Sequence, residues 1–265
     1  MKIKSFINIE SIWRRSLKYF GYYYIWLFYK ERTNPNKKML QMRSLYSDFV
    51  KDGDLCFDIG ANMGSRVNCF LILNAKVVAV EPNKDCVAEL KKVYHNYPLT
   101  IVQKGVGFLN EVKDFYISSS SLVSSFSKEW IETVRQKHKK ESWNKVEKIE
   151  IVTLDSLIKQ YGKPDFIKID TEGFEQEVLK GLTTPVKALS FEYTLPDPHQ
   201  KALECLNIID KLYNGRALYN ICKDEAYTMH FPAFVAQDKL RELLTSDLFC
   251  DGKFGNYGDI YVKQV

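Results

Sequence analysis

After residue 50 the chain alternates short apolar runs with longer segments of mixed polarity. Strand-like runs cover Leu55–Ile59, Lys76–Glu81 and Leu99–Gln103, and helix-compatible sequence at 63–73 and 83–95 fills the two intervals between them. Apolar runs of about four to eight residues that alternate with helical patterns are typical of strand–helix–strand units. The pattern therefore predicts a parallel sheet with right-handed helical connections.

The same alternation continues to the end of the chain, with one interruption. The interval 118–127 holds seven serines, which predicts a loop, and the charged stretch 128–148 predicts a surface helix or a flap. Further strands are expected at 112–117, 147–153, 165–170, 187–193, 217–222 and 259–263, and further helices at 155–161, 171–181, 198–213 and 237–247. We therefore expect one α/β domain over residues 47–265.

Aromatic and basic residues crowd the segment that precedes this domain. Its charge-free run from Tyr19 to Tyr29 is shorter than the ~18 residues that a membrane-spanning helix needs. A helix that is aromatic on more than one face has two surfaces to bury. It could pack on the domain or on a second copy in a homodimer. Alternatively, residues 1–32 contact a membrane peripherally, with their cations on anionic lipid. A second helix is expected at 37–50, and residues 1–46 are predicted to form a basic, aromatic helical extension.

Charge is distributed unevenly between these two parts. The net charge is +5, but residues 1–46 hold ten Lys/Arg and two Asp/Glu. The rest of the chain therefore has 28 Lys/Arg and 31 Asp/Glu, a slight excess of negative charge. The domain is therefore not expected to bind nucleic acid through its charge. Six scattered cysteines without a Cys-x-x-Cys pair predict free thiols in a reducing compartment. With no secretory signal pattern at the start, the sequence predicts a cytoplasmic protein, which could also lie peripherally on a membrane.

The turn after the first strand carries the strongest chemical signal. Asp58 precedes it, Gly60 and Gly64 flank it, and Glu81 ends the next strand. Bare backbone, a helix N-terminus and a carboxylate for ribose hydroxyls are what nucleotide-like cofactors require. Asn62 stands where the dinucleotide fingerprint has its middle glycine, and an acid before the turn suits a cofactor with a cationic amino-acid head. These features favour S-adenosylmethionine.

A set of motifs in this order resembles the FkbM family of S-adenosylmethionine-dependent methyltransferases. The most specific piece is the run Lys168-Ile-Asp-Thr-Glu-Gly173 with the glutamate that follows it, and the serine-rich loop around 118–125 also fits. The other matching pieces are Phe57–Gly64, Val80–Asn83, Lys104–Gly107, Thr153–Leu157, Val178–Gly181 and Phe191–Glu192. The resemblance covers residues 54–193 and leaves residues 1–46 outside.

The resemblance implies a fold, a reaction and a set of cofactor contacts. The fold is a Rossmann-like class I methyltransferase fold, with a mostly parallel seven-stranded sheet whose last strand is antiparallel. The reaction is O-methylation of a hydroxyl on a glycan or a secondary metabolite. By position, the methionine part of the cofactor would be held by Asp58, Gly60, Ala61, Asn62 and Gly64, its ribose side by Glu81, Pro82 and Asn83, and its adenine by Lys104, Gly105 and Val106. Asp170 would lie near the sulfonium and the acceptor. The family often has alanine where Gly105 stands.

Acids at the expected strand ends supply candidates for catalysis. Asp170, Glu172 and Glu192 stand where open α/β sheets bind ligands. Any of them could take the proton of an alcohol acceptor. The three could instead hold a hydrated Mg²⁺ that orients a diol. His199, in the loop after the strand 187–193, is a further candidate base.

Several neighbouring residues are given structural roles instead. Lys168 lies in a buried strand pattern, so its amine is expected to pair with a nearby acid. Glu175 and Glu177 are expected on a helix surface, where they favour the N-terminal dipole. His230 is expected to be an exposed loop residue. The loop 118–127 could close over the acceptor and present hydroxyls to it.

Three functions from different classes stay open on the sequence. The first is an O-methyltransferase acting on a small-molecule or glycan hydroxyl, with a lipid hydroxyl or secondary metabolite as the alternative acceptor. The second is an NAD-type oxidoreductase, disfavoured by the missing glycine and by the lack of a Tyr-x-x-x-Lys pair. The third is a non-catalytic module that docks on a membrane or a partner.

Overall fold

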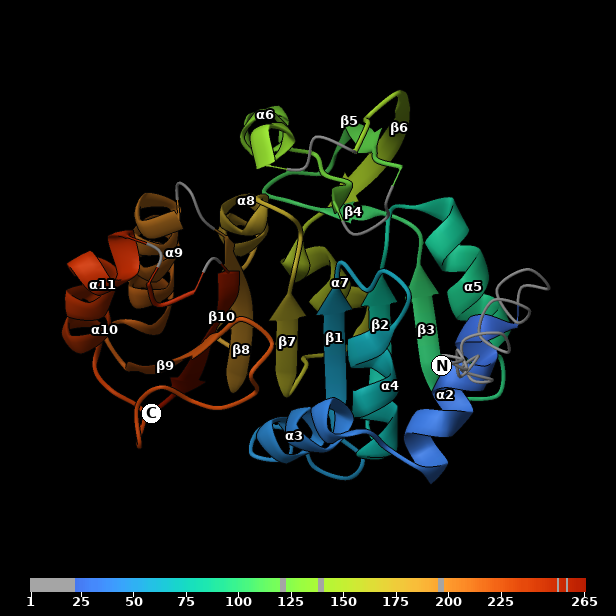
Figure 1. Cartoon of the computed structure of the whole chain (residues 1–265), viewed down its shortest axis with the longest axis horizontal. Helices are drawn as coiled ribbons and strands as arrows, with labels where there is room; N and C mark the ends of the chain where they lie inside the picture. Colours follow the sequence, from blue (N-terminus) through green and yellow to red (C-terminus); the bar gives the residue numbers. More distant parts are fainter. Residues whose placement is uncertain (1–21, 120–122, 138–140, 195–197, 252, 256) are drawn as a thin grey trace, which may run out of the picture.

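A seven-stranded sheet forms the centre of the molecule (Figure 1). The computed structural model describes residues 22–119, 123–137, 141–194, 198–251, 253–255 and 257–265. The strands are ordered β3-β2-β1-β7-β8-β10-β9, and β10 pairs antiparallel with both of its neighbours. Their bounds are β1 Leu55–Ile59, β2 Lys76–Val80, β3 Leu99–Val102, β7 Phe166–Ile169, β8 Ala188–Thr194, β9 Ala217–Lys223 and β10 Tyr257–Gln264. The predicted Rossmann-like class I fold, mostly parallel with an antiparallel last strand, is confirmed.

The middle strands are mostly apolar because helices cover both faces of the sheet. Phe57 and Ile59 of β1 face one core, whereas Cys56 faces the other. Neighbouring β7 is buried along its whole length. The strand order reverses between β1 and β7, and ligands bind at such switch points in open α/β sheets.

The helices divide between the two faces of the sheet. Residues of α7–α11 contribute to one core, and residues of α2–α5 contribute to the other. Their bounds are α2 Tyr23–Thr33, α3 Lys37–Tyr46, α4 Ser65–Ile72, α5 Lys84–Tyr94, α7 Leu154–Tyr161, α8 Glu175–Lys180, α9 Pro198–Tyr213, α10 Gln237–Leu244 and α11 Asp247–Cys250.

Two predicted helices differ from the observed ones in ways that matter for the site. The helix expected from residue 171 begins at Glu175, because Glu172 and Gly173 have φ of +53° and +85°. Left-handed backbone cannot continue a right-handed helix, so residues 171–174 form a turn instead. The helix expected at 37–50 ends at Tyr46, where a turn leads toward β1.

A small second sheet lies beyond the carboxyl ends of the central strands (Figure 1). It has the order β4-β6-β5, with β4 Gly105–Val106, β5 Glu111–Ile117 and β6 Lys145–Val152. Helix α6, Lys128–Lys137, stands beside it. The sequence predicted the two longer strands but did not place them in a sheet of their own.

The described part of the N-terminal extension packs on the domain. Phe28 of α2 is 2% exposed, and its ring meets Tyr94 and Tyr97 edge-to-face at 5.1 and 4.9 Å between centroids. The guanidinium of Arg32 lies over Phe28 and Tyr97. The predicted contacts of residues 1–21 lie outside the described residues. Within the described residues, every helix is too short or too polar to cross a bilayer.

Replacing Phe28 with alanine is expected to lower the free energy of unfolding by about 3 kcal/mol or more, because it leaves a cavity beside the rings of Tyr94 and Tyr97. Urea denaturation of the full chain measures the change. Tyr29→Ala is the matched comparison: Tyr29 is 56% exposed on the same helix, and its ring meets Phe28 edge-to-face at 5.2 Å, so its loss should cost only about 1 kcal/mol or less. Equal stability of the two variants would show that α2 does not dock through Phe28.

Candidate active site

A cavity of about 610 Å³ opens at the carboxyl edge of the central sheet. Asp58 of β1, Glu81 after β2 and Asp170 after β7 line it from three neighbouring strands. Val106 of the small sheet and Tyr24 of the N-terminal extension complete its walls. The cavity therefore joins parts of the chain that are far apart in sequence.

The turn after β1 requires glycine at its first position. Gly60 has φ of +86°, and a Cβ there would lie 1.8 Å from the carbonyl oxygen of Asp170. Asn62 follows at φ of +46°, a conformation that asparagine adopts more readily than most residues. The turn is fixed to β2 because the backbone N–H of Gly60 donates to Val80 at 2.9 Å.

The second glycine of the turn serves helix packing. Gly64 has φ of +84°, and a Cβ there would meet Leu90 and Tyr94 of α5 at 2.7 and 2.9 Å. It is not among the residues that line the cavity. Its small size allows α4 to approach α5, and that approach fixes the position of the turn.

Glu81 is oriented by the backbone around it. Its two carboxylate oxygens accept from the N–H groups of Asn62 and Asn83 at 2.7 and 2.8 Å. Burial raises the pKa of Glu81 to about 7, although these two hydrogen bonds oppose the shift. Asn83 also caps α5, because its side chain accepts from the N–H of Asp85. Each oxygen of Glu81 keeps a lone pair for a ligand hydroxyl.

Asp58 presents a carboxylate oxygen without a partner. The residue is 1% exposed, and its Oδ2 has no hydrogen-bond partner in the described structure. Burial raises the pKa of Asp58 to about 7, while the cations of Arg66 and Lys168 pull it down. A buried unpaired acceptor is costly, so this oxygen is suited to receive a donor from a ligand.

The residues expected around an adenine ring also line the cavity. They are Lys104, Gly105 and Val106, and the cavity is also lined by Ala61, expected at the methionine part, and Pro82, expected on the ribose side. A Cβ on Gly105 would come within 2.5 Å of Ile151 and 2.6 Å of Phe126. The ring of Phe126 therefore occupies the space that a larger residue at position 105 would need.

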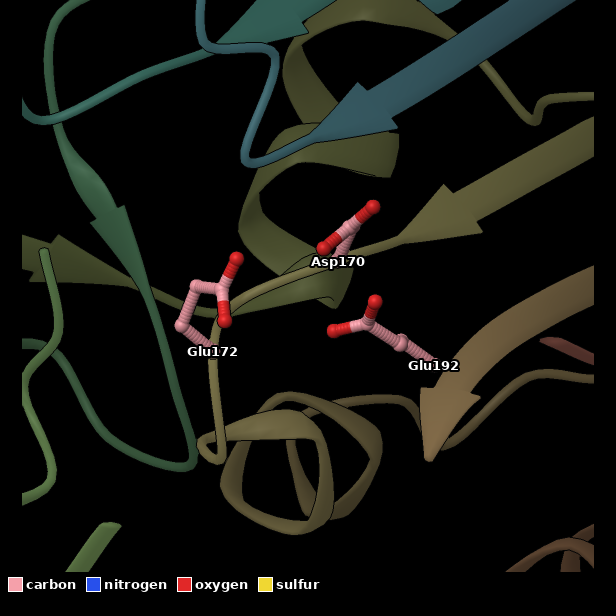
Figure 2. A group of neighbouring side chains, drawn as sticks. All are labelled: Asp170, Glu172 and Glu192. Carbon is pink, nitrogen blue, oxygen red and sulfur yellow. The ribbon is translucent and has the colours of Figure 1, made fainter. Parts of the chain in front are cut away.

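Three acids that line the cavity point toward one another (Figure 2). Asp170 follows β7, Glu172 lies in the next turn and Glu192 belongs to β8. One carboxylate oxygen from each lies within 4.8 Å of those of the others. Carboxylates this close could exchange protons or hold a hard cation such as Mg²⁺.

A buried lysine controls the charge of this group. Lys168 is fully buried, and its Nζ lies 2.7 Å from Asp259 and 3.3 Å from Asp170. The predicted pairing of Lys168 with an acid is confirmed, and Asp259 is a partner that the sequence analysis missed. Burial alone would raise the pKa of Asp170, but Lys168 and Arg66 outweigh it, so that pKa lies below its ordinary value.

The pKa values of the two glutamates shift in the opposite direction to that of Asp170. Burial, and then repulsion from Asp170, raise the pKa of Glu172 and of Glu192 well above the ordinary value. Asp170 therefore carries the negative charge, and the glutamates are the stronger proton acceptors once they are ionised.

The remaining predicted residues have different outcomes. Glu175, expected on a helix surface, is buried and accepts from the N–H groups of Thr171 and Gly173, because the turn before α8 needs an internal acceptor. Glu177 lies on the surface and binds Lys180. His230 is exposed and packs against Phe231. The backbone of His199 belongs to α9, but its side chain lies outside the described residues.

The serine-rich loop reaches the cavity, and other lining residues come from segments that the sequence analysis passed over. Ser124 and Phe126 line the cavity, and the hydroxyl of Ser125 donates to the carbonyl of Glu172 at 2.7 Å. The lining residues that the sequence analysis did not single out include Tyr24, Lys38, Met63, Ser65, Arg66, Asp224, Glu225, Tyr257 and Asp259. Of these residues, Met63, Ser65 and Arg66 had a local signal, because they lie in the turn after β1 or just behind it.

Solved structures with a similar arrangement of the chain share little sequence with it. A precorrin-6Y C5,15-methyltransferase from Geobacter metallireducens GS-15 is 14% identical, with 88% of this chain and 90% of that chain covered and a TM-score of 0.40. A ribosomal protein L11 methylase from Lactobacillus delbrueckii subsp. bulgaricus is 9% identical, with 86% and 80% covered and a TM-score of 0.43.

One relative is more similar in sequence. The hexuronic acid methyltransferase AglP of Haloferax volcanii is 30% identical over 144 residues, which are 54% of this chain and 55% of that protein. The chain thus matches about half the length of this relative.

The methyltransferase FkbM domain matches residues 58–221, which include the turn after β1, the acid of β2 and the acid cluster. The match covers more than half of the chain. This chain therefore belongs to the FkbM family of methyltransferases.

Proposed function

We propose that the chain is an S-adenosylmethionine-dependent O-methyltransferase that acts on a hydroxyl of a glycan. One observation carries the proposal: a single cavity joins the unpartnered carboxylate of Asp58 to the acid cluster of Asp170, Glu172 and Glu192. The first feature suits a cofactor with an ammonium group, and the second suits an alcohol that must lose a proton.

The cofactor would lie along the edge of β1, β2 and β3. Its ammonium would donate to Asp58, and its ribose hydroxyls would donate to Glu81. Its adenine would border Lys104, Gly105 and Val106, which places the sulfonium toward Asp170. Each contact pairs a donor of the cofactor with an acceptor that lines the cavity.

Methyl transfer is an in-line displacement at carbon. An electron pair of the acceptor oxygen would form the new bond to the methyl carbon as the carbon–sulfur bond breaks, with S-adenosylhomocysteine as the leaving product. Positioning supplies much of the rate because the sulfonium is already a strong electrophile. We assign the proton of the alcohol to Glu192, since Lys168 engages Asp170 and Glu172 belongs to the turn that closes the cavity floor.

The acceptor class rests on the relative's name. AglP is named a hexuronic acid methyltransferase, which favours a sugar acceptor over a lipid or a secondary metabolite. Family membership favours methyl transfer over NAD-type oxidation. Peripheral membrane contact through residues 1–32 and a homodimer stay predictions.

The acid cluster has an alternative use. Asp170, Glu172 and Glu192 could bind a hydrated Mg²⁺ that orients two neighbouring hydroxyls of the acceptor. In that case the three carboxylates would hold the ion, and the ion would supply Lewis-acid assistance to the loss of the acceptor's proton.

The proposal is tested by transfer of a labelled methyl group from S-adenosylmethionine to a panel of glycans with and without hexuronic acids. We expect a base-stable methyl ether on a sugar of at least one acceptor. Labelling of carboxylates alone, detected as base-labile esters, would contradict O-methylation of a hydroxyl.

Binding of S-adenosylhomocysteine is expected to release protons near neutral pH. Asp58 and Glu81 have pKa values raised to about 7, and both must be ionised to accept from the ligand. Affinity should therefore rise with pH, by about tenfold between about pH 6 and pH 8 for each carboxyl that must lose its proton. Calorimetry in two buffers of different ionisation enthalpy counts the protons. A binding heat that is the same in both buffers would contradict this assignment.

A further inference from the structure

Few cationic side chains line the cavity, and they lie at different ends of it. The cationic side chains that line it are Lys38, Arg66 and Lys104. Lys104 follows β3 and binds Glu150 of β6, so it belongs to the adenine end. Arg66 is the second residue of α4, directly after the turn that carries Gly60, so it belongs to the end where Asp58 lies.

Acids dominate the rest of the lining. They are Asp58, Glu81, Asp170, Glu172, Glu192, Asp224, Glu225 and Asp259. A ligand that carries a carboxylate is repelled by most of this surface. It can place that group favourably only beside a cation that is not already hydrogen-bonded.

Arg66 has unused hydrogen-bonding capacity. Its Nε is buried and has no hydrogen-bond partner in the described structure. Its Nη2 lies 3.8 Å from Glu225, which is too far for a hydrogen bond. Lys38, by contrast, forms a direct hydrogen bond with Glu225. Because a guanidinium offers five donors, Arg66 can still bind a planar two-oxygen acceptor.

One anionic and one cationic side chain thus lie at the same end of the cavity, and each has a polar atom without a hydrogen-bond partner. Asp58 offers Oδ2 as an acceptor, and Arg66 offers Nε as a donor. The two residues lie close enough that the cation of Arg66 opposes the effect of burial on the pKa of Asp58. A carboxylate that accepts hydrogen bonds, next to a guanidinium that donates them, matches the ammonium and the carboxylate of a zwitterionic amino acid.

We propose that Arg66 binds the α-carboxylate of the methionine part of S-adenosylmethionine, while Asp58 accepts from its ammonium group. The assignment rests on the proposed function, because it needs this cofactor in this cavity. It adds a residue that selects the amino-acid end of the cofactor. Glu225, which lies beside Arg66, competes with the cofactor carboxylate for the guanidinium.

The test compares two ligands that differ only in the carboxylate. S-adenosylhomocysteine and its decarboxylated analogue are titrated calorimetrically into the full chain. We expect the analogue to bind the wild-type chain at least about tenfold more weakly, as for the loss of a charge-assisted hydrogen bond. In Arg66→Met, S-adenosylhomocysteine should lose a similar factor while the analogue is unchanged, so the ratio of the two dissociation constants falls toward one.

Two further variants keep the test decisive if Arg66→Met folds poorly. Glu225→Gln removes the competing carboxylate from a half-exposed position, so S-adenosylhomocysteine should bind more tightly and the analogue should not. Lys104→Met is the matched control, since it removes a cation from the other end of the cavity and should leave the ratio unchanged.

The outcomes separate this inference from the proposed function. No binding of S-adenosylhomocysteine to the wild-type chain would overturn the proposed function. Binding with a wild-type ratio near one would overturn only the role of Arg66. A tenfold wild-type ratio that persists in Arg66→Met, or a Glu225→Gln variant that affects both ligands equally, would do the same.

Discussion

Replacing Asp58 with asparagine is expected to weaken binding of S-adenosylhomocysteine by about 10- to 100-fold. The carboxylate is buried at the end of β1, and its Oδ2 is left for a ligand donor. Loss of a charge-assisted hydrogen bond in such a place costs about 1.5–3 kcal/mol. The variant should fold normally, because an amide removes the cost of burying a charge. Calorimetry at about pH 8, where the wild-type carboxyl is ionised, measures the loss.

Asp85→Asn is the control for this substitution. Asp85 is an exposed acid at the start of α5, close in sequence to Glu81, and it does not line the cavity. Its replacement should change affinity by less than about threefold. Similar losses in both variants would indicate a general effect of charge, and an unaffected Asp58→Asn variant would remove Asp58 from the cofactor site.

Glu192→Gln is expected to lower kcat by about 10²- to 10⁴-fold, the usual contribution of a general base. Affinity for S-adenosylhomocysteine should stay within about threefold, because the proposal assigns Glu192 to the acceptor and not to the cofactor. The amide keeps the size of the side chain and can still accept from the hydroxyl of Thr194, which lies 3.3 Å from the carboxylate. Single-turnover methyl transfer with saturating cofactor isolates the chemical step.

A control variant and a chelation assay identify the role of Glu192. Glu177→Gln removes an exposed glutamate of α8 and should leave kcat unchanged. Assays of the wild-type chain with and without a chelator decide between base and metal ligand: activity that survives chelation favours the base, and activity that returns with added Mg²⁺ favours the metal. A Glu192→Gln variant with normal kcat would exclude both roles.

Local sequence was enough to predict the parts of the site that one strand and its turn create. Gly60 and Asn62 have left-handed backbone, and glycine and asparagine are the residue types that favour it. Asp58 is the last residue but one of β1 and Glu81 directly follows β2, and because these strands pair in register, the placement of both acids at one edge follows from the strand pattern. The burial of Lys168 in a continuous apolar strand already required an acidic partner.

Long-range packing determined what the sequence analysis missed. Arg66, Lys38 and Glu225 meet only because α3, α4 and the turn after β9 lie side by side, and no spacing in the chain records that contact. Asp259 reaches Lys168 because β10 runs antiparallel and brings its first residues to the carboxyl edge of the sheet. Glu175 was assigned to a helix surface because the left-handed turn before it has no clear sequence pattern.

The central claim is that this cavity binds the methyl donor, and calorimetric titration of the full wild-type chain with S-adenosylhomocysteine tests it most directly. We predict saturable binding with one ligand per chain, competed by S-adenosylmethionine and not by NAD. The absence of binding at millimolar S-adenosylhomocysteine, in a chain that unfolds cooperatively, would contradict the account.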